Sequence, residues 1–182
     1  MRLLLALSLC LGLPLGASAQ GYVPAHERGA SDPASGTELV MVYLGSSTCA
    51  PCRDARFKQT VERAKNLLAG RAEREGARFA TMGVALDHNV DDGLAFLQDS
   101  GRWDEVAAGR NWLNAAALAH VWRPDGLEGR TVALPTVVVF ERDVEVGDAV
   151  AASAPRYLGE WVGAFAIPDW VEAGAPLGDT RD

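Results

Sequence analysis

The sequence predicts an α/β domain with a central mixed β-sheet flanked by helices. Residues 39–44 form a continuously apolar run typical of a buried strand, and a helical pattern follows from residue 51. Residues 78–87 form a second strand-like run, and the order strand, helix, strand predicts a right-handed crossover between two parallel strands. Strongly β-forming runs at residues 131–140 and 156–162 complete the predicted sheet.

The composition fits one globular domain, because 48% of the 182 residues are hydrophobic and 23% are charged. The formal net charge is −7. This acidic balance argues against nucleic acid, and against an anionic membrane surface, as partners.

The first 19 residues have the parts of a secretory signal peptide. Arg2 supplies an early positive charge, residues 3–15 are apolar, and Ala17-Ser18-Ala19 matches a small-residue cleavage site. A membrane anchor would need about 20 apolar residues, more than this run contains. We therefore expect export to the periplasm or the extracellular space. The mature chain would begin at Gln20, would carry a net charge of −8 after loss of Arg2, and would not span a membrane.

The mature chain should begin with a flexible lead-in at residues 20–36, which are rich in Gly, Ala, Pro and Ser. The domain is expected to cover residues 37–176, and residues 177–182 should form a frayed tail. After the first strand, a helix should run from residue 51 to about residue 68 or a little beyond and end at Gly70 or Gly76.

Residues 90–123 are predicted to form a helical insertion, because the segment is too long for a simple connector. Two helices are expected in it, at residues 91–98 and 111–122. Its aliphatic core candidates are Leu94, Leu97, Leu113, Leu118 and Val121. General burial tendencies favour a core position for the aromatic residues as well, although they could instead form a substrate surface. These aromatic residues are Trp103, Trp112 and Trp122.

The C-terminal part begins with a turn at residues 124–126 and the strand at residues 131–140. Pro135 belongs at the start of that strand, because proline cannot donate to a sheet ladder. A turn or hairpin tip is expected at residues 141–148, and a last strand at residues 156–162, with a bulge at Gly159. A closing helix should cover residues 167–173 and stop at Gly174.

Two cysteines, Cys49 and Cys52, remain once the signal peptide and its Cys10 are removed. A disulfide that closes so small a loop stabilises a fold very little. Their predicted place at the start of a helix instead favours a thiolate, because free backbone N–H groups and the helix dipole stabilise negative charge. The turn at residues 87–89 should lie on the same edge of the sheet, where working groups gather.

The apolar strand, the Cys49-Ala50-Pro51-Cys52 motif that opens a helix, and the downstream Leu134-Pro135-Thr136 run together resemble the thioredoxin-fold superfamily. The resemblance covers most of the mature chain and implies a thioredoxin-like fold. It implies that Cys49 is the exposed attacking thiolate and Cys52 the buried resolving thiol. It also implies a cis peptide bond at Pro135, which faces the pair, and substrate contacts through Leu134, Pro135 and Thr48.

Three departures from the family pattern stand out. Thr48 replaces the usual Trp before the first cysteine, and Tyr43 stands where an acid would lie beneath the dithiol. Asp87 or His88 are the candidates to replace that acid. The long separation between Cys49 and Pro135 fits the predicted insertion and resembles the enlarged exported oxidoreductases.

The resemblance implies an exported thiol-disulfide oxidoreductase that acts on protein substrates and is recycled by a redox partner, without cofactor or metal. Pro51 is similar to the residue found in reductant members, which favours a reductase over a disulfide-donating oxidase.

Alternatives of other classes remain open. A non-catalytic binding module could use Trp103 and Trp112 as its recognition surface. A zinc site could combine the two thiolates with His88 and His120, although these lack ligand spacing. Covalent haem attachment is disfavoured, because Arg53 stands where a histidine is needed.

Overall fold

The computed structural model describes residues 34–123 and 132–178. The predicted signal peptide, most of the lead-in, the turn at residues 124–126 and the last four residues lie outside this part. The sheet contains β1 (Gly36–Gly45), β2 (Arg78–Ala85), β3 (Glu105–Ala108), β4 (Thr136–Val146), β5 (Val150–Ala152) and β6 (Arg156–Val162). Around it lie α1 (Ala50–Arg53), α2 (Ala55–Glu75), α3 (Val90–Ser100), the 3-10 helix η2 (Asn111–Leu113), α4 (Ala115–His120) and α5 (Ala166–Glu172). The predicted α/β class with a mixed sheet flanked by helices is confirmed.

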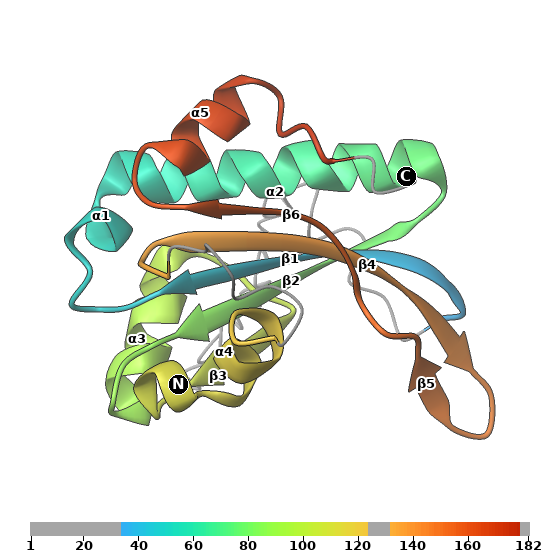
Figure 1. Cartoon of the computed structure of the whole chain (residues 1–182), viewed down its shortest axis with the longest axis horizontal. Helices are drawn as coiled ribbons and strands as arrows, with labels where there is room; N and C mark the ends of the chain where they lie inside the picture. Colours follow the sequence, from blue (N-terminus) through green and yellow to red (C-terminus); the bar gives the residue numbers. More distant parts are fainter. Residues whose placement is uncertain (1–33, 124–131, 179–182) are drawn as a thin grey trace, which may run out of the picture.

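β1 is the central strand of the curled sheet (Figure 1). It pairs in parallel with β2 and antiparallel with β4, so that Leu44 near its end lies opposite Thr136. β3 adds in parallel to β2, while β5 and β6 both pair antiparallel with β4. The parallel strands β1 and β2 therefore end at one edge of the sheet, and β4 begins at that same edge.

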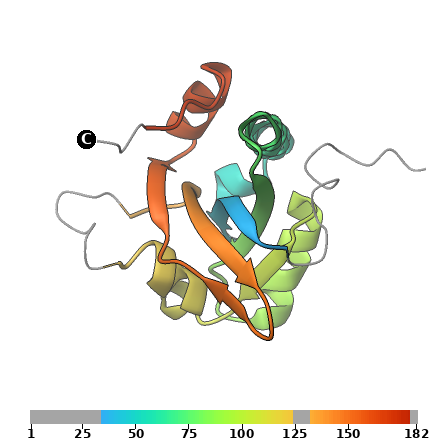
Figure 2. The same ribbon diagram turned by 90° about the vertical axis from the view of Figure 1, so that its right-hand side faces the viewer.

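Side chains of β1 alternate between two hydrophobic cores, one on each face of the sheet, as the period of two in a strand requires. Met41 and Tyr43 belong to the larger core, which also contains buried residues of α2, α3 and α5. Val42 and Leu44 belong to the smaller core, which is covered by α4. Figure 2 shows α2 and α5 on one side of the sheet and α4 on the other.

The helix after β1 is interrupted, whereas the sequence predicted one continuous helix from residue 51. Asp54 has an extended backbone with ψ 132°, which separates the single turn of α1 from α2. Its carboxylate accepts from the N–H groups of Arg56 and Phe57, so Asp54 begins α2 as an N-cap. α2 then runs past Gly70 and ends at Gly76, which adopts the left-handed conformation with φ 70°.

The insertion at residues 90–123 contains helices as predicted, but it also contains a strand that the sequence did not predict. α3 matches the first predicted helix, but β3 follows it and extends the sheet beyond β2. The second predicted helix is split into η2 and α4 at Asn114, whose side chain caps α4. β3 has only four residues and exposed Glu105 and Val106 at its start, so no two-residue periodicity marks it.

The core predictions for the insertion hold in part. Leu97 and Val121 are buried with 1% exposure each, and Leu94 is half-buried. Leu113 and Leu118 are wrong as core candidates, because they are 60% and 46% exposed. Leu118 lies on the face of α4 away from the buried Ala116 and Ala117, and Leu113 lies in the short η2.

The C-terminal strands differ from the prediction mainly in the length of β4. β4 continues to Val146 and forms a protruding hairpin with β5, where the sequence predicted a turn from residue 141 (Figure 1). β6 has the predicted bounds, with a register shift next to Gly159. α5 lies where the closing helix was predicted, and Gly174 follows it with φ 90°. Among the described helices, none combines the length and the apolar character that crossing a membrane requires.

Candidate active site at the Cys49–Cys52 disulfide

Cys49 and Cys52 form a disulfide with 2.03 Å between the two sulfurs. The two residues differ in access, because Cys52 is fully buried whereas Cys49 is partly exposed. Cys49 is the N-cap of α1, and its Sγ accepts a hydrogen bond from the Cys52 N–H at 3.3 Å. A partner molecule could therefore approach Cys49 but not Cys52.

The Cys49 sulfur accepts from an N–H group three residues away, and not from the start of a long helix. The expectation that the dipole of a long helix would stabilise a thiolate here is therefore corrected. α1 is one turn long, and the carboxylate of Asp54 already occupies the first N–H groups of α2. A helix dipole acts mainly within its first turn, and a capping carboxylate offsets it there. The Cys52 N–H is thus the donor that the structure offers to Cys49.

The turn before Cys49 is bound to the end of β2 through Asp87, which is 6% exposed. Both carboxylate oxygens of Asp87 accept from the Ser47 N–H at 3.2 Å, and the Ser47 hydroxyl also donates to the carboxylate. The Ser46 hydroxyl makes a longer contact of 3.4 Å with the carboxylate. Sequence reasoning placed Asp87 on this edge of the sheet but did not single out the two serines, because small polar residues occur in most turns.

The Leu134–Pro135 peptide bond is cis, and it lies at the same edge of the sheet as the disulfide. Pro135 immediately precedes Thr136, which pairs with Leu44, and the Pro135 carbonyl accepts from the Gly163 N–H at 2.8 Å. Leu134 packs against the core that also contacts Cys49. Thr48 is exposed, and its hydroxyl lies 2.9 Å from that of Ser46. The strand register therefore places the five site residues named from the sequence at one edge of the sheet.

An exposed aromatic residue lies next to this edge and was missed by the sequence analysis. Phe165 is 85% exposed in the loop between Gly163 and α5. A pocket of about 330 Å³ adjoins the same loop, with Pro51, Ala164 and Pro168 among its lining residues. The sequence offers one weak signal for this loop, the small residues Gly163 and Ala164 before the helix. Nothing in the sequence shows that Phe165 is exposed and does not belong to the core.

Tyr43, which the sequence resemblance aligned with an acid beneath the dithiol, belongs to the same core as Cys52. It is 1% exposed, and burial raises the pKa of its hydroxyl far above the usual value, so Tyr43 stays neutral and cannot act as a base. Its ring stacks on Trp103 with 5.5 Å between centroids. Of the two suggested substitutes, Asp87 bonds to the turn before Cys49, and His88 is exposed beside Asn111.

The other histidine proposed as a zinc ligand lies on the opposite face of the sheet. His120 stacks on Phe140, which belongs to the smaller core, with 5.1 Å between ring centroids. Burial lowers the pKa of His120 to about 4, and nearby Arg123 and Arg142 contribute to the same direction. Within residues 34–123 and 132–178, no group of three or more His, Cys, Asp and Glu side chains could hold a metal ion.

The tryptophans of the insertion do not form one surface. Trp103 is half-buried between the Lys65 ammonium, 3.6 Å from its ring centroid, and the ring of Tyr43. Trp112 and Trp122 meet edge to face at 5.8 Å, and Trp122 is 37% exposed. Trp103 is therefore a packing residue, as general burial tendencies predicted.

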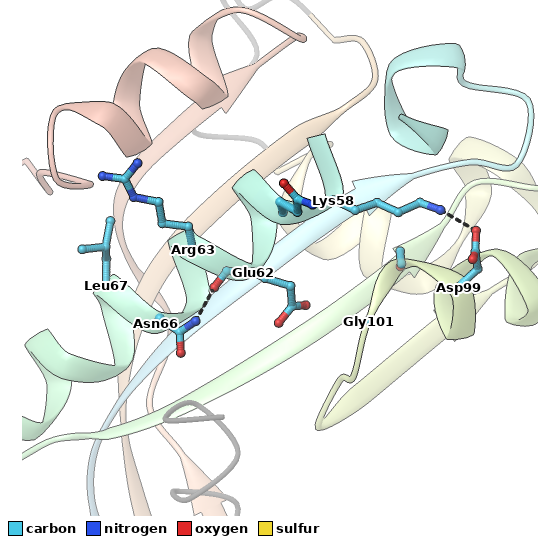
Figure 3. Close-up of a pocket in the computed structure, with 9 residues that line it drawn as sticks. Lys58, Glu62, Arg63, Asn66, Leu67, Asp99 and Gly101 are labelled. Carbon is cyan, nitrogen blue, oxygen red and sulfur yellow. Dashed lines mark hydrogen bonds and ion pairs between the residues drawn. The ribbon is translucent and has the colours of Figure 1, made fainter. Parts of the chain in front are cut away.

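A larger pocket of about 600 Å³ lies away from the disulfide, between α2 and the end of α3 (Figure 3). Figure 3 shows Lys58 reaching from α2 toward Asp99, with which it forms an ion pair. The exposed fractions of these two side chains are 22% and 71%, so water screens the pair. The lining residues include no cysteine or histidine, and we place the functional site at the disulfide for its chemistry.

Comparisons with protein-family models, with curated proteins and with solved structures find no match for this chain. The site is therefore defined by its own geometry. A partly exposed cysteine is bonded to a buried one, the turn before it is bound by a buried carboxylate, and a cis-proline lies at the adjacent start of β4.

Proposed function

We propose that this chain is an exported thiol-disulfide oxidoreductase with a thioredoxin-like fold. The observation that carries the proposal is the difference in exposure between the two residues of the pair, because Cys49 is partly exposed and Cys52 is buried. Disulfide exchange requires one sulfur that a substrate can reach and a second that can displace the substrate afterwards. A purely structural bridge has no such requirement, and closing so short a loop stabilises little.

The element order supports the fold part of the proposal. β1, α2, β2 and α3 form a crossover unit, and β4, β6 and α5 follow after the insertion. The central strands then lie in the order β2, β1, β4, β6, with the cysteine motif after β1 and the cis-proline before β4. This order is compatible with a thioredoxin-like fold, in which β3 would be an addition at the β2 edge.

In the proposed reaction, the Cys49 thiolate attacks a sulfur of a substrate disulfide, forms a mixed disulfide and releases one substrate thiolate, which takes up a proton. Cys52 then loses its proton and attacks the Cys49 sulfur, which releases the second substrate thiol. The enzyme is left with the Cys49–Cys52 disulfide, and two electrons have passed to the substrate. A dithiol partner must return those electrons to restore the reduced enzyme.

Two features of the sequence support the reductive direction and the exported location. Pro51 before the second cysteine is similar to the reductant members of the family. The signal-peptide pattern of the first 19 residues supports a periplasmic or extracellular location, where protein disulfides form. We assign substrate contacts to Thr48, Leu134 and Pro135, which lie at the same edge of the sheet as the Cys49–Cys52 pair.

The test is the reduction of insulin disulfides by dithiothreitol, with the purified mature protein as catalyst. We expect the protein to accelerate the reaction and Cys49→Ser to lower the rate to that of dithiothreitol alone. Cys52→Ser should instead accumulate a mixed disulfide with the substrate, because the resolving thiol is missing. An equal rate with and without Cys49 would reject catalysis and favour a non-catalytic binding module with a static bridge.

A further inference from the structure

Asp87 is a buried carboxylate whose hydrogen bonds all reach the turn that carries Cys49. It is 6% exposed and lies just after β2, whereas the turn follows β1. Its oxygens accept from the Ser47 N–H at 3.2 Å and from the hydroxyls of Ser47 and Ser46. Burying a carboxylate is costly unless several donors compensate it, so the turn and Asp87 hold one another in place.

The same turn continues directly to the exposed cysteine. The Ser46 carbonyl accepts from the Cys49 N–H at 3.1 Å, and the Ser46 hydroxyl accepts from the Thr48 N–H at 3.2 Å. Asp87 is itself fixed by its backbone, because its carbonyl accepts from the Asn111 N–H at 3.1 Å. An unbroken chain of hydrogen bonds therefore runs from the insertion through Asp87 and Ser46 to Cys49.

We propose that Asp87 is a positioning residue for Cys49, which keeps the attacking sulfur in place when the disulfide is open. This inference rests on the proposed function of the dithiol. In the oxidised protein the bond to Cys52 restrains Cys49, but in the reduced protein the turn must do so alone. A turn that is free in the reduced protein gains conformational entropy there, which favours the reduced form and slows attack on a substrate.

The equilibrium between the protein dithiol and glutathione disulfide measures this effect. Asp87→Ala should lower the equilibrium constant for forming the Cys49–Cys52 disulfide by about tenfold, which corresponds to about 30 mV. Asp87→Asn keeps an oxygen that accepts from the Ser47 N–H, so it should recover most of the loss. Ser47→Ala removes the hydroxyl that donates to Asp87 and leaves the carboxylate in place, so it should lower the equilibrium constant by about threefold. This variant provides the test if Asp87→Ala does not fold.

Asp104 provides a matched control, because it makes a similar clamp elsewhere on the sheet. It accepts from the Thr81 N–H at 2.7 Å and from the Thr81 hydroxyl at 2.8 Å. Thr81 pairs with Met41, four residues before the end of β1 and so about 13 Å along the strand. Asp104→Ala should reduce stability without moving the glutathione equilibrium.

The inference is overturned if Asp87→Ala leaves the glutathione equilibrium unchanged, or if Asp104→Ala moves it equally. Equal changes of the equilibrium constant in Asp87→Ala and Asp87→Asn would also overturn it. They would mean that the negative charge of Asp87, and not its hydrogen bonds to the turn, determines the equilibrium. Loss of the proposed function has a different signature. In that case the parent protein would fail to reduce insulin, whereas failure of this inference leaves the parent active and the variants unchanged in their equilibrium.

Discussion

The two faces of the sheet each bury a basic side chain against aromatic rings, but they give it different neighbours. On the face covered by α2, Lys65 is fully buried over Trp103 and donates to Glu62 at 2.6 Å and to the Arg102 carbonyl at 2.8 Å. On the face covered by α4, His120 stacks on a phenylalanine and shares a hydrogen bond of 3.2 Å with the Tyr157 hydroxyl.

The neighbours determine which charge state each face stabilises. Lys65 has an anionic partner and two aromatic or carbonyl contacts that favour a cation. His120 lies near two cations, Arg123 and Arg142, and burial together with these charges lowers its pKa to about 4. Similar packing against rings therefore accompanies an ion pair on the face that holds the buried Cys52, and a histidine with a lowered pKa on the other.

The largest effect is expected from Lys65. Lys65→Ala should destabilise the protein by about 4 kcal/mol, because it leaves a cavity over Trp103 and removes the donor to the Arg102 carbonyl and to Glu62. Lys65→Met fills most of the volume without the charge, and exchange of a buried ion for a well-packed apolar group is often near neutral, so it should lose about 1 kcal/mol. Urea unfolding measures both.

Lys58 on the same helix is the control for this prediction. Its ion pair with Asp99 is partly exposed, so Lys58→Ala should change stability by less than about 1 kcal/mol. If Lys65→Met were as damaging as Lys65→Ala, the charge and its hydrogen bonds, and not the filled volume, would dominate on this face.

The second effect is a loss of stability in acid that originates at His120. Its pKa is about 4 in the folded protein and 6.5 in a free side chain, so the unfolded state binds more protons between these values. Stability is therefore fully present above pH 6.5 and falls progressively as the pH is lowered toward 4. The difference between the two pKa values corresponds to about 3 kcal/mol of unfolding free energy, which is lost once the pH is below 4. Unfolding free energies at a series of pH values measure the slope.

A histidine on the exposed surface separates this effect from general acid denaturation. His120→Gln should flatten the pH dependence of stability between pH 6.5 and 4, since the residue no longer titrates. His88→Gln, at an exposed position, should leave that slope as it is in the parent protein. The assignment fails if both variants keep the full slope.

Much of the fold and the candidate site followed from local patterns in the sequence. The cysteine spacing, the apolar strand before it and a proline at the start of a β-forming run each depend on residues that are neighbours in the chain. These predicted β1, the start of β4, and the residues Cys49, Cys52 and Pro135, which lie at one edge of the sheet.

The remaining features depend on contacts between distant segments. β3 is a strand because β2 offers it a pairing edge, and its own four residues carry no clear period. The Asp87 clamp joins residues about 40 positions apart, so neither Ser47 nor Asp87 shows it alone. The break at Asp54 is an exception, because aspartate three residues before an apolar position is a known N-cap signal that the continuous helical pattern concealed.

The smallest expected effect concerns the N-caps of the helices that cover the two faces. Asp54 caps α2 on the first face and is exposed, whereas Asn114 caps α4 on the second and is 3% exposed. Asn114 also donates to the Gly109 carbonyl at 3.1 Å, a bond that water could not easily replace.

We therefore expect Asn114→Ala to lose about 2 kcal/mol and Asp54→Ala about 1 kcal/mol in thermal or urea unfolding. Asn114→Asp keeps the capping oxygen but not the donor, so it should fall between the two. A larger loss at Asp54 than at Asn114 would contradict this order and would mean that the break between α1 and α2 depends on its cap more than the short helix α4 does.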